Sequence, residues 1–219
     1  MTQRVKNRCR LVLITPSNQD AAGLSTNLKA AVSAGDVASI IVPQYDMSDD
    51  IYQELLSHMV EIGQTAGAAV IAAGDTRIAG RCNADGLHVS GGFTEVRAAL
   101  KEFGQKWIVG CGGPETRHAA LTLGEENPDY VFFGRFGQDT HAAPHKRNLE
   151  LADWWSKVVA VPCILMGGND LATLADAAGT GADFVALSTA ILSDGVDAAR
   201  VCADANSILS AYVFEDDAA

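Results

Sequence analysis

The amino-acid sequence predicts an α/β fold, a single (β/α)8 TIM barrel that covers residues 1–219. Eight short apolar runs recur along the chain, and the intervals between them have room for helices. Most runs are continuously apolar rather than alternating, which is typical of parallel strands that are covered on both faces. The last two runs end in glycine or hydroxyl residues, where barrels of this class often bind phosphate. A doubly wound open sheet would give a similar alternation, but eight strands and the late phosphate signal favour the closed barrel.

The predicted elements follow one another without a long unpatterned interval. The strands are expected at residues 11–15, 37–42, 68–73, 84–89, 107–111, 129–134, 161–166 and 183–187. Helical patterns lie at residues 24–34, 51–66, 93–103, 115–126, 149–158 and 171–178. The shortest connector, between residues 73 and 84, still has room for a short helix at 76–81. The acidic end at 212–219 contains no motif and is expected to be a frayed tail.

Composition narrows the classes of protein that this chain can represent. With 48% hydrophobic residues, the chain can bury a substantial core. No segment has the apolar length of a membrane helix, and the polar start lacks the centre of a signal peptide, so we expect a cytoplasmic protein. The formal net charge of −11 disfavours nucleic-acid and anionic membrane partners. A homodimer is compatible with this composition. The five scattered cysteines are expected to be buried free thiols rather than disulfides or metal ligands.

Two neighbouring strand ends carry residues suited to binding a phosphate. Gly167 and Gly168 follow the seventh predicted strand, and glycine lets backbone N–H groups approach an anion closely. Ser188 and Thr189 follow the eighth strand at a predicted helix N-terminus, which favours negative charge. The glycines could instead form only a tight turn, and the hydroxyls could be only helix caps. We predict that all four residues bind the phosphate of a phosphorylated small molecule.

A resemblance to a known family rests on these strand ends together with ADGLHV at 84–89 and DYVFFG at 129–134. Over residues 10–192 the chain resembles the thiamine phosphate synthase and thiazole tautomerase family. The resemblance implies a TIM barrel whose last two strand ends hold the phosphate of a thiazole. It implies a transferase of thiamine biosynthesis, which joins hydroxymethylpyrimidine diphosphate to thiazole phosphate and releases pyrophosphate. Magnesium (Mg2+) would bind the diphosphate. A thiazole tautomerase, or a catalytically reduced member that only binds a phosphorylated heterocycle, are the alternatives.

The resemblance implies roles for three further residues. Asp75 matches the aspartate that follows the third strand and is the expected magnesium ligand, although Gly74 precedes it where the family has asparagine. Its other interpretation is a helix N-cap. Lys146 corresponds to the lysine in the loop after the sixth strand. With Arg135 it is expected to stabilise the departing pyrophosphate, whose developing charge requires cations already in place.

Two parts of the family pattern are missing. The second acidic magnesium ligand is expected after ADGLHV, where this chain has SGGF at 90–93. After the second strand, the family's glutamine, arginine and lysine are replaced in register by Ile41, Pro43 and Tyr45. Gln44 could substitute only if the register slips, and a one-residue slip turns side chains to the opposite face. The monophosphate half-site is therefore expected to be retained, whereas the diphosphate half-site would need other cations, with Arg77 and Arg147 as further candidates.

The loop after the sixth strand is long and polar. It contains His141 and His145 as well as Lys146, at the end of the barrel where enzymes of this class build their sites. It is either a solvated surface or a mobile lid. His88, inside an apolar strand, is expected to be a hydrogen-bonded barrel residue rather than a catalytic base.

Overall fold

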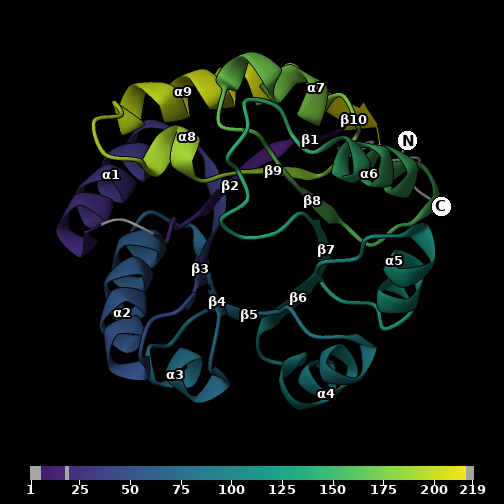
Figure 1. Ribbon diagram of the computed structural model, residues 1–219, viewed down its shortest axis with the longest axis horizontal. Coiled ribbons are helices and arrows are strands. Elements are labelled where there is room, and N and C mark those ends of the chain that lie inside the picture. The colour runs from purple at the N-terminus through teal and green to yellow at the C-terminus, as the bar shows by residue number, and fades with distance from the viewer. Residues whose placement is uncertain (1–5, 18–19, 216–219) are drawn as a thin grey trace, which may run out of the picture.

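The computed structural model describes residues 6–17 and 20–215, and eight of its strands form a closed parallel barrel. These strands are β2 (Arg10–Ile14), β3 (Val37–Pro43), β4 (Ala69–Ala73), β5 (Gly86–Val89), β6 (Ile108–Gly112), β7 (Tyr130–Phe133), β8 (Cys163–Met166) and β9 (Phe184–Leu187). β9 pairs with β2 and closes the ring, which Figure 1 shows from the C-terminal ends of the strands. The prediction of a TIM barrel is confirmed, and the open sheet is excluded.

Helices surround the barrel on its outer side (Figure 1). They are α1 (Ala21–Ala34), α2 (Asp49–Thr65), α3 (Thr76–Arg81), α4 (Phe93–Phe103), α5 (Arg117–Gly124), α6 (Lys146–Val158), the 3-10 turn η1 (Leu171–Thr173), α7 (Leu174–Ala178), α8 (Thr189–Leu192) and α9 (Ala198–Leu209). The sequence interpretation placed no helix at α9. α1 and α6 begin three residues before their predicted starts because Asp20 and His145 cap them, each accepting a backbone N–H with its side chain.

Six of the eight barrel strands begin one or two residues later than predicted, and an aspartate directly precedes three of these six. Asp85, Asp129 and Asp183 lie just before β5, β7 and β9. Their carboxylates accept the backbone N–H groups of Val70, Val109 and Cys163, at 2.7, 2.7 and 2.8 Å. The side chain of each aspartate therefore satisfies a donor at the start of the neighbouring strand, and its own strand begins at the next residue.

Alternate residues of the strands enter two separate apolar layers. Val12 and Ile14 of β2 point into the barrel, where they join Ile41, Phe132 and Met166 in an inner cluster. The intervening residues of the same strands belong to an outer cluster shared with the helices. Every strand is thus covered on both faces, which explains why the runs in the sequence are continuously apolar.

Aromatic side chains fill the barrel because glycines on the adjacent strand leave room for them. A Cβ atom on Gly110 would lie 2.0 Å from the ring of Tyr130, and one on Gly112 would lie 2.7 Å from the ring of His88. His88 Nδ1 lies 2.9 Å from the Tyr130 hydroxyl, which confirms the prediction of a hydrogen-bonded barrel histidine. Burial lowers the pKa of His88 to about 3, so its ring is neutral.

The two ends of the described chain pair with each other. β1 (Lys6–Arg8) and β10 (Val213–Glu215) form an antiparallel ribbon. The expected frayed tail is therefore wrong for residues 213–215, because backbone pairing with the start of the chain holds them. Residues 216–219 lie outside the described residues.

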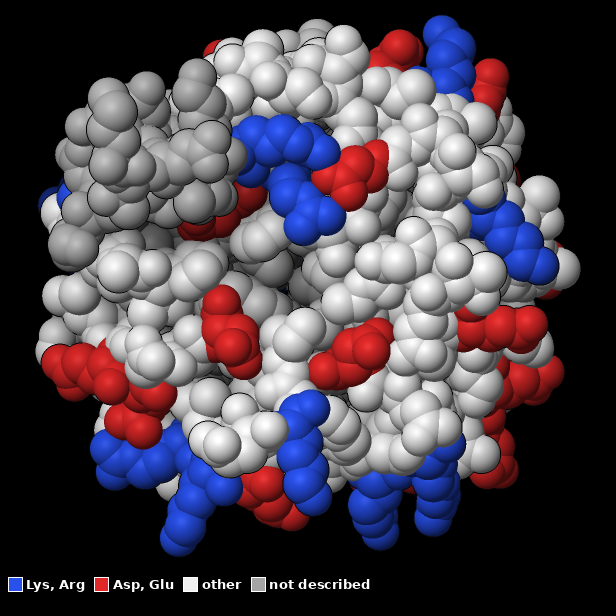
Figure 2. Space-filling model, turned by 180° about the vertical axis from the view of Figure 1, so that it is seen from behind, with Lys and Arg blue, Asp and Glu red and all other residues white. Residues whose placement is uncertain are grey.

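Basic and acidic side chains are interspersed at the N-terminal end of the barrel, which Figure 2 shows from behind the view of Figure 1. There Asp36 forms ion pairs with Arg8 and Arg10. The hydrogen bond from Arg10 is the main reason why the pKa of Asp36 is lowered. Both arginines therefore already have an anionic partner.

Two expectations from composition can be compared with the structure. All five cysteines are buried and free, as predicted. Among the described residues, no helix combines the length and the apolar character needed to cross a bilayer.

Candidate active site

The segment at residues 134–145, called here the β7–α6 loop, crosses the C-terminal mouth of the barrel (Figure 1). Near its start, the Phe136 ring lies 4.8 Å from the His88 ring and 5.2 Å from the Phe132 ring, so it covers the aromatic centre of the barrel. Near its other end, the carbonyl oxygen of His141 accepts the backbone N–H of Asn169 at 2.9 Å. The loop therefore spans from the barrel centre to the turn after β8.

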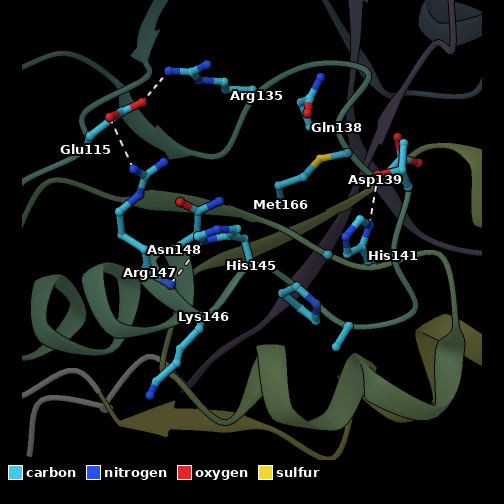
Figure 3. A pocket seen from close by; sticks show the side chains of 14 residues that line it. Glu115, Arg135, Gln138, Asp139, His141, His145, Lys146, Arg147, Asn148 and Met166 are labelled. Carbon is cyan, nitrogen blue, oxygen red and sulfur yellow. Dashed lines mark hydrogen bonds and ion pairs between the residues drawn. The ribbon is translucent and has the colours of Figure 1, made fainter.

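A cavity of about 790 Å³ opens beside this loop and is lined by four of the anion-binding candidates predicted from the sequence. These are Arg135, Lys146, Arg147 and Gly167. The other walls come from Glu115 before α5, from the β7–α6 loop and from the start of α6 (Figure 3). The structure thus brings the two predicted pyrophosphate contacts and one predicted phosphate contact to one cavity.

Glu115 holds two of the cations in this cavity. Its carboxylate forms ion pairs with Arg135 and Arg147, the latter at 3.1 Å, and Figure 3 shows it between the two guanidinium groups. All three side chains are substantially exposed, so these pairs contribute little to stability and can exchange for an anion. Lys146 extends away from this group (Figure 3), with its Nζ 3.8 Å from Glu150 and its side chain 88% exposed.

The start of α6 places positive charge where a helix favours negative charge. Lys146 and Arg147 occupy its first two positions, and the Nδ1 atom of the capping residue His145 accepts the N–H of Arg147 at 3.2 Å. Cations are stabilising near the C-terminus of a helix and unfavourable near its N-terminus. An anion bound in the cavity would offset the unfavourable positive charge at the start of α6.

The turn after β8 is already contacted by the β7–α6 loop. The Gly167 N–H donates to Ala186 on the neighbouring strand at 2.8 Å. A Cβ atom on Gly168 would lie 1.9 Å from the carbonyl oxygen of Ala142, so only glycine permits this close approach of two backbones. The same carbonyl accepts the N–H of Asp170 at 3.2 Å. Loop carbonyl groups thus occupy the backbone donors that follow the two glycines.

The end of β9 is also occupied by the loop. The carboxylate of Asp139 accepts the backbone N–H of Thr189 at 2.7 Å and its hydroxyl at 2.6 Å. Asp139 is only 5% exposed. The Ser188 hydroxyl is buried and has no hydrogen-bond partner within the described parts of the chain. Of the two hydroxyls predicted to bind phosphate, one therefore holds a carboxylate and the other is unsatisfied.

Asp75 lies apart from this group, between β4 and α3. It caps α3, with its carboxylate accepting the N–H groups of Arg77 and Ile78 at 2.7 and 3.4 Å. It also pairs with the Arg77 guanidinium at 2.9 Å. The hydrogen bond from this guanidinium is the main reason why the pKa of Asp75 falls to about 2. Across residues 6–17 and 20–215, no group of three or more His, Cys, Asp or Glu side chains is placed to hold a metal ion.

The positions that replace the family's glutamine, arginine and lysine have structural contacts. Ile41 belongs to the inner apolar cluster, and Pro43 ends β3. Tyr45 has a left-handed backbone with φ 46°, and its hydroxyl donates to the Thr15 carbonyl at 2.9 Å. The Gln44 side chain accepts the Asp75 N–H at 3.2 Å and donates to Asp49 at 2.9 Å. These residues brace the rim of the barrel.

A family model described as thiamine monophosphate synthase matches residues 11–191. The chain belongs to this family. The thiamine-phosphate synthase of Rhodospirillum centenum is 32% identical over 202 residues, covering 92% of this chain and 98% of that protein. The thiamine-phosphate synthase of Hyphomonas neptunium is 32% identical over 196 residues, covering 87% and 89%. These similarities confirm the family inferred from the strand-end motifs.

Similarity to solved structures supports the fold of this family. The thiamine phosphate pyrophosphorylase from Pyrococcus furiosus superimposes with a TM-score of 0.76 at 16% identity, covering 94% of this chain and 98% of that one. A 3-hexulose-6-phosphate synthase superimposes with a TM-score of 0.70 at 17% identity, covering 90% and 99%. At these identities, the comparison concerns the barrel alone.

Three residues at this end of the barrel have contacts that the sequence interpretation did not assign. Glu115 pairs with two arginines, Phe136 covers the barrel centre, and Asp139 binds Thr189. Asp139 is the one acidic residue of the loop at 134–145, which also carries Arg135, His141 and His145. A lone carboxylate in this loop indicates a specific contact. The sequence does not show that this contact is with Thr189, because Thr189 lies 50 positions further along the chain.

Proposed function

We propose that this chain catalyses the synthase reaction of its family. The ring nitrogen of a thiazole phosphate attacks the methylene carbon of hydroxymethylpyrimidine diphosphate. A C–N bond forms, the C–O bond to the diphosphate breaks, and pyrophosphate leaves with the electron pair. The observation that carries this proposal is the cavity beside the end of β8, whose lining includes Arg135, Lys146 and Arg147.

The monophosphate of the thiazole is proposed to bind at the turns after β8 and β9. Gly167 and Gly168 allow a phosphate to approach the backbone closely, and Ser188 and Thr189 supply hydroxyl donors. The unsatisfied Ser188 hydroxyl supports this assignment, because a buried donor without a partner costs free energy unless a ligand satisfies it.

The departing pyrophosphate is proposed to occupy the cavity at the start of α6. Arg135 and Arg147 can exchange Glu115 for phosphate oxygens, and Lys146 can swing towards them because its side chain is highly exposed. Cations already placed around the leaving group stabilise the charge that develops as the C–O bond breaks. These residues replace the family cations that are absent after β3.

Magnesium is the part of the family pattern that the described residues do not fit. Two N–H groups and the Arg77 guanidinium already engage the Asp75 carboxylate, and no cluster of potential ligands surrounds it among the described residues. Magnesium prefers six oxygen ligands in near-octahedral geometry. We therefore assign no step of the reaction to a metal held by Asp75.

Lys146→Ala tests whether the cavity at the start of α6, called here the α6 cavity, binds the departing pyrophosphate. We expect turnover to fall about tenfold or more, because Lys146 meets charge that develops only in the transition state, while thiazole phosphate affinity changes little. Thiamine phosphate formation and calorimetric titration with thiazole phosphate give the two numbers. Lys157→Ala is the matched control, because Lys157 lies near the other end of α6 and pairs with Asp153. Equal losses of turnover and affinity would contradict the leaving-group role.

A second candidate function is binding or isomerisation without pyrophosphate release. It is supported by the absence of the family's cations after β3 and of its second acidic residue after β5. A member that binds only a phosphorylated heterocycle, or a thiazole tautomerase, needs the monophosphate half-site alone. Titration with thiazole phosphate, and separately with a pyrimidine diphosphate analogue and magnesium, separates the functions. Binding of both ligands with product formation supports the synthase, whereas binding of the monophosphate alone supports the second function.

We further infer a cytoplasmic setting and a phosphorylated small molecule as the substrate. The net charge of −11 argues against nucleic acid as a partner. A homodimer is also proposed, and sedimentation equilibrium tests it directly.

A further inference from the structure

The contact between Asp139 and Thr189 puts an anion of the protein itself at the proposed monophosphate position. The carboxylate accepts both the N–H and the hydroxyl of Thr189, at 2.7 and 2.6 Å. Within the described parts of the chain, no cation pairs with Asp139, although it is only 5% exposed. Its buried charge is therefore held by neutral donors at a strand-to-helix turn, as a bound phosphate would be.

The same loop covers the other half of this position. The carbonyl groups of His141 and Ala142 accept the N–H groups of Asn169 and Asp170, at 2.9 and 3.2 Å. Ala142 also accepts the Thr173 hydroxyl at 2.9 Å. Oxygen atoms of one loop thus bind the donors after both β8 and β9, and a ligand phosphate needs these same donors.

The Ser188 hydroxyl shows how the Asp139 carboxylate differs from a bound phosphate ester. It is 1% exposed and has no partner in the part of the chain that the structure describes, although Thr189 beside it is fully engaged. Both Thr189 groups donate to one carboxylate oxygen, Oδ2 of Asp139, and neither carboxylate oxygen contacts the Ser188 hydroxyl. A phosphate ester offers three terminal oxygens and more charge, and can engage Ser188 as well.

We propose that Asp139 is a specificity-determining residue, which occupies the monophosphate position until a phosphate ester displaces it together with the β7–α6 loop. This inference rests on the proposed function for the position of the phosphate. An uncharged alcohol binds these donors more weakly than the Asp139 carboxylate does, and so cannot displace it. Only the phosphorylated heterocycle can, and the site therefore selects it over the free alcohol. Because Arg135 belongs to the same loop, displacement also rearranges one cation of the α6 cavity.

Asp139→Asn tests the exchange, with inorganic phosphate as the ligand. The amide keeps the size of the side chain but removes the charge with which phosphate competes. We expect phosphate to bind about tenfold more tightly than to the unmodified protein in calorimetric titration. Asp197→Asn is the matched control, because Asp197 caps α9 through the Arg200 N–H at 3.1 Å, and it should leave phosphate affinity unchanged. Unchanged or weaker binding to Asp139→Asn, or no binding to either protein, would overturn the proposal.

A second measurement uses the unmodified protein and so does not depend on a variant that folds. Displacement of the loop frees its backbone, so phosphate should accelerate tryptic cleavage after Arg135, whereas chloride at equal ionic strength should not. Slower or unchanged cleavage at a phosphate concentration that saturates binding would reject the displacement. Thiamine phosphate formation is assayed separately. If phosphate binding shows the exchange but no product forms, the synthase function fails while the role of Asp139 stands.

Discussion

Gly168 lies at the point where the turn after β8 meets the β7–α6 loop. Its missing side chain allows the Ala142 carbonyl oxygen to come to 1.9 Å from the place that a Cβ atom would occupy. Both groups are backbone, so neither can turn aside as a flexible side chain would. Gly168 therefore permits the loop to approach this turn closely, in addition to its proposed contact with phosphate.

Gly168→Ala should destabilise the protein by about 1–3 kcal/mol, because the added methyl group forces two backbones apart. Tryptic cleavage after Arg135 should accelerate in the same variant. Urea unfolding and timed proteolysis measure the two effects. Gly80→Ala serves as the control, since a Cβ atom there meets only Trp107 at an ordinary 3.6 Å. An unchanged free energy of unfolding in Gly168→Ala would show that the loop is not held at this point.

His88 should make the stability of the protein depend on pH. Burial lowers its pKa in the folded state to about 3, whereas the pKa of histidine in an unfolded chain is about 6.5. The neutral ring is favoured in the fold, so its contribution is complete above pH 6.5 and is lost as the pH falls towards 3. Between these values, the free energy of unfolding should fall by about 1.4 kcal/mol for each pH unit.

Urea unfolding of the unmodified protein and of His88→Gln at pH 7, 6 and 5 checks this expectation. The variant should lose the part of the pH dependence that belongs to His88, even though its stability at pH 7 is lower. His118→Gln, on the exposed surface of α5, is the control and should keep the full dependence. Parallel pH profiles for the unmodified protein and His88→Gln would contradict the expectation.

At the scale of an element, α3 shows how one residue can fit two interpretations in the sequence. Asp75 follows a strand and precedes a helix, which suits both a metal ligand at a barrel mouth and an N-cap. The structure gives its carboxylate two helix N–H groups and the Arg77 guanidinium. The local needs of α3 thus account for this aspartate.

Asp75→Asn separates the two interpretations, because asparagine is as good an N-cap as aspartate but lacks the charge. We expect the melting temperature and the magnesium dependence of thiamine phosphate formation to remain close to those of the unmodified protein. Asp75→Ala should lower the melting temperature because the cap is lost. A clear rise in the magnesium concentration that Asp75→Asn requires would establish Asp75 as a metal ligand.

At the scale of the whole molecule, the barrel keeps its reactive sulfur atoms away from solvent. All five cysteines are buried and free. Burial raises the pKa of Cys9 and Cys111 to about 12 and that of Cys202 to about 11. A thiol must be exposed and deprotonated before it reacts, so each of these cysteines depends on opening of the fold.

Reaction with a disulfide reagent such as DTNB at pH 8 should therefore be slow for all five thiols in the folded protein. In guanidinium chloride at unfolding concentration, all five should react within seconds. Saturating phosphate should leave the slow rates unchanged or slow them further. Rapid reaction of one thiol in the folded protein would identify a part of the barrel that opens independently of the whole.

Much of the fold could be predicted because the signals are local. Apolar runs mark all eight barrel strands, and small residues mark the ends of β8 and β9. The errors have local causes as well. The side chain of Asp85 accepts a backbone N–H of the neighbouring strand, and β5 begins one residue after it. His145 caps α6, so this helix begins three residues before its apolar pattern. The β1–β10 ribbon was missed because its two strands lie at opposite ends of the sequence.

The sequence by itself determined the barrel, the family and the residue types available for binding phosphate, because apolar periodicity and strand-end motifs depend on neighbours along the chain. Only the tertiary structure decided what those residues contact. Asp139 reaches Thr189 across 50 positions, and Phe136 reaches His88 inside the barrel. Such contacts depend on the path of one loop over a closed surface, and that path is set by packing and hydrogen bonds between distant segments. No local pattern encodes this path, so the contact between Asp139 and Thr189 becomes visible only in the folded barrel.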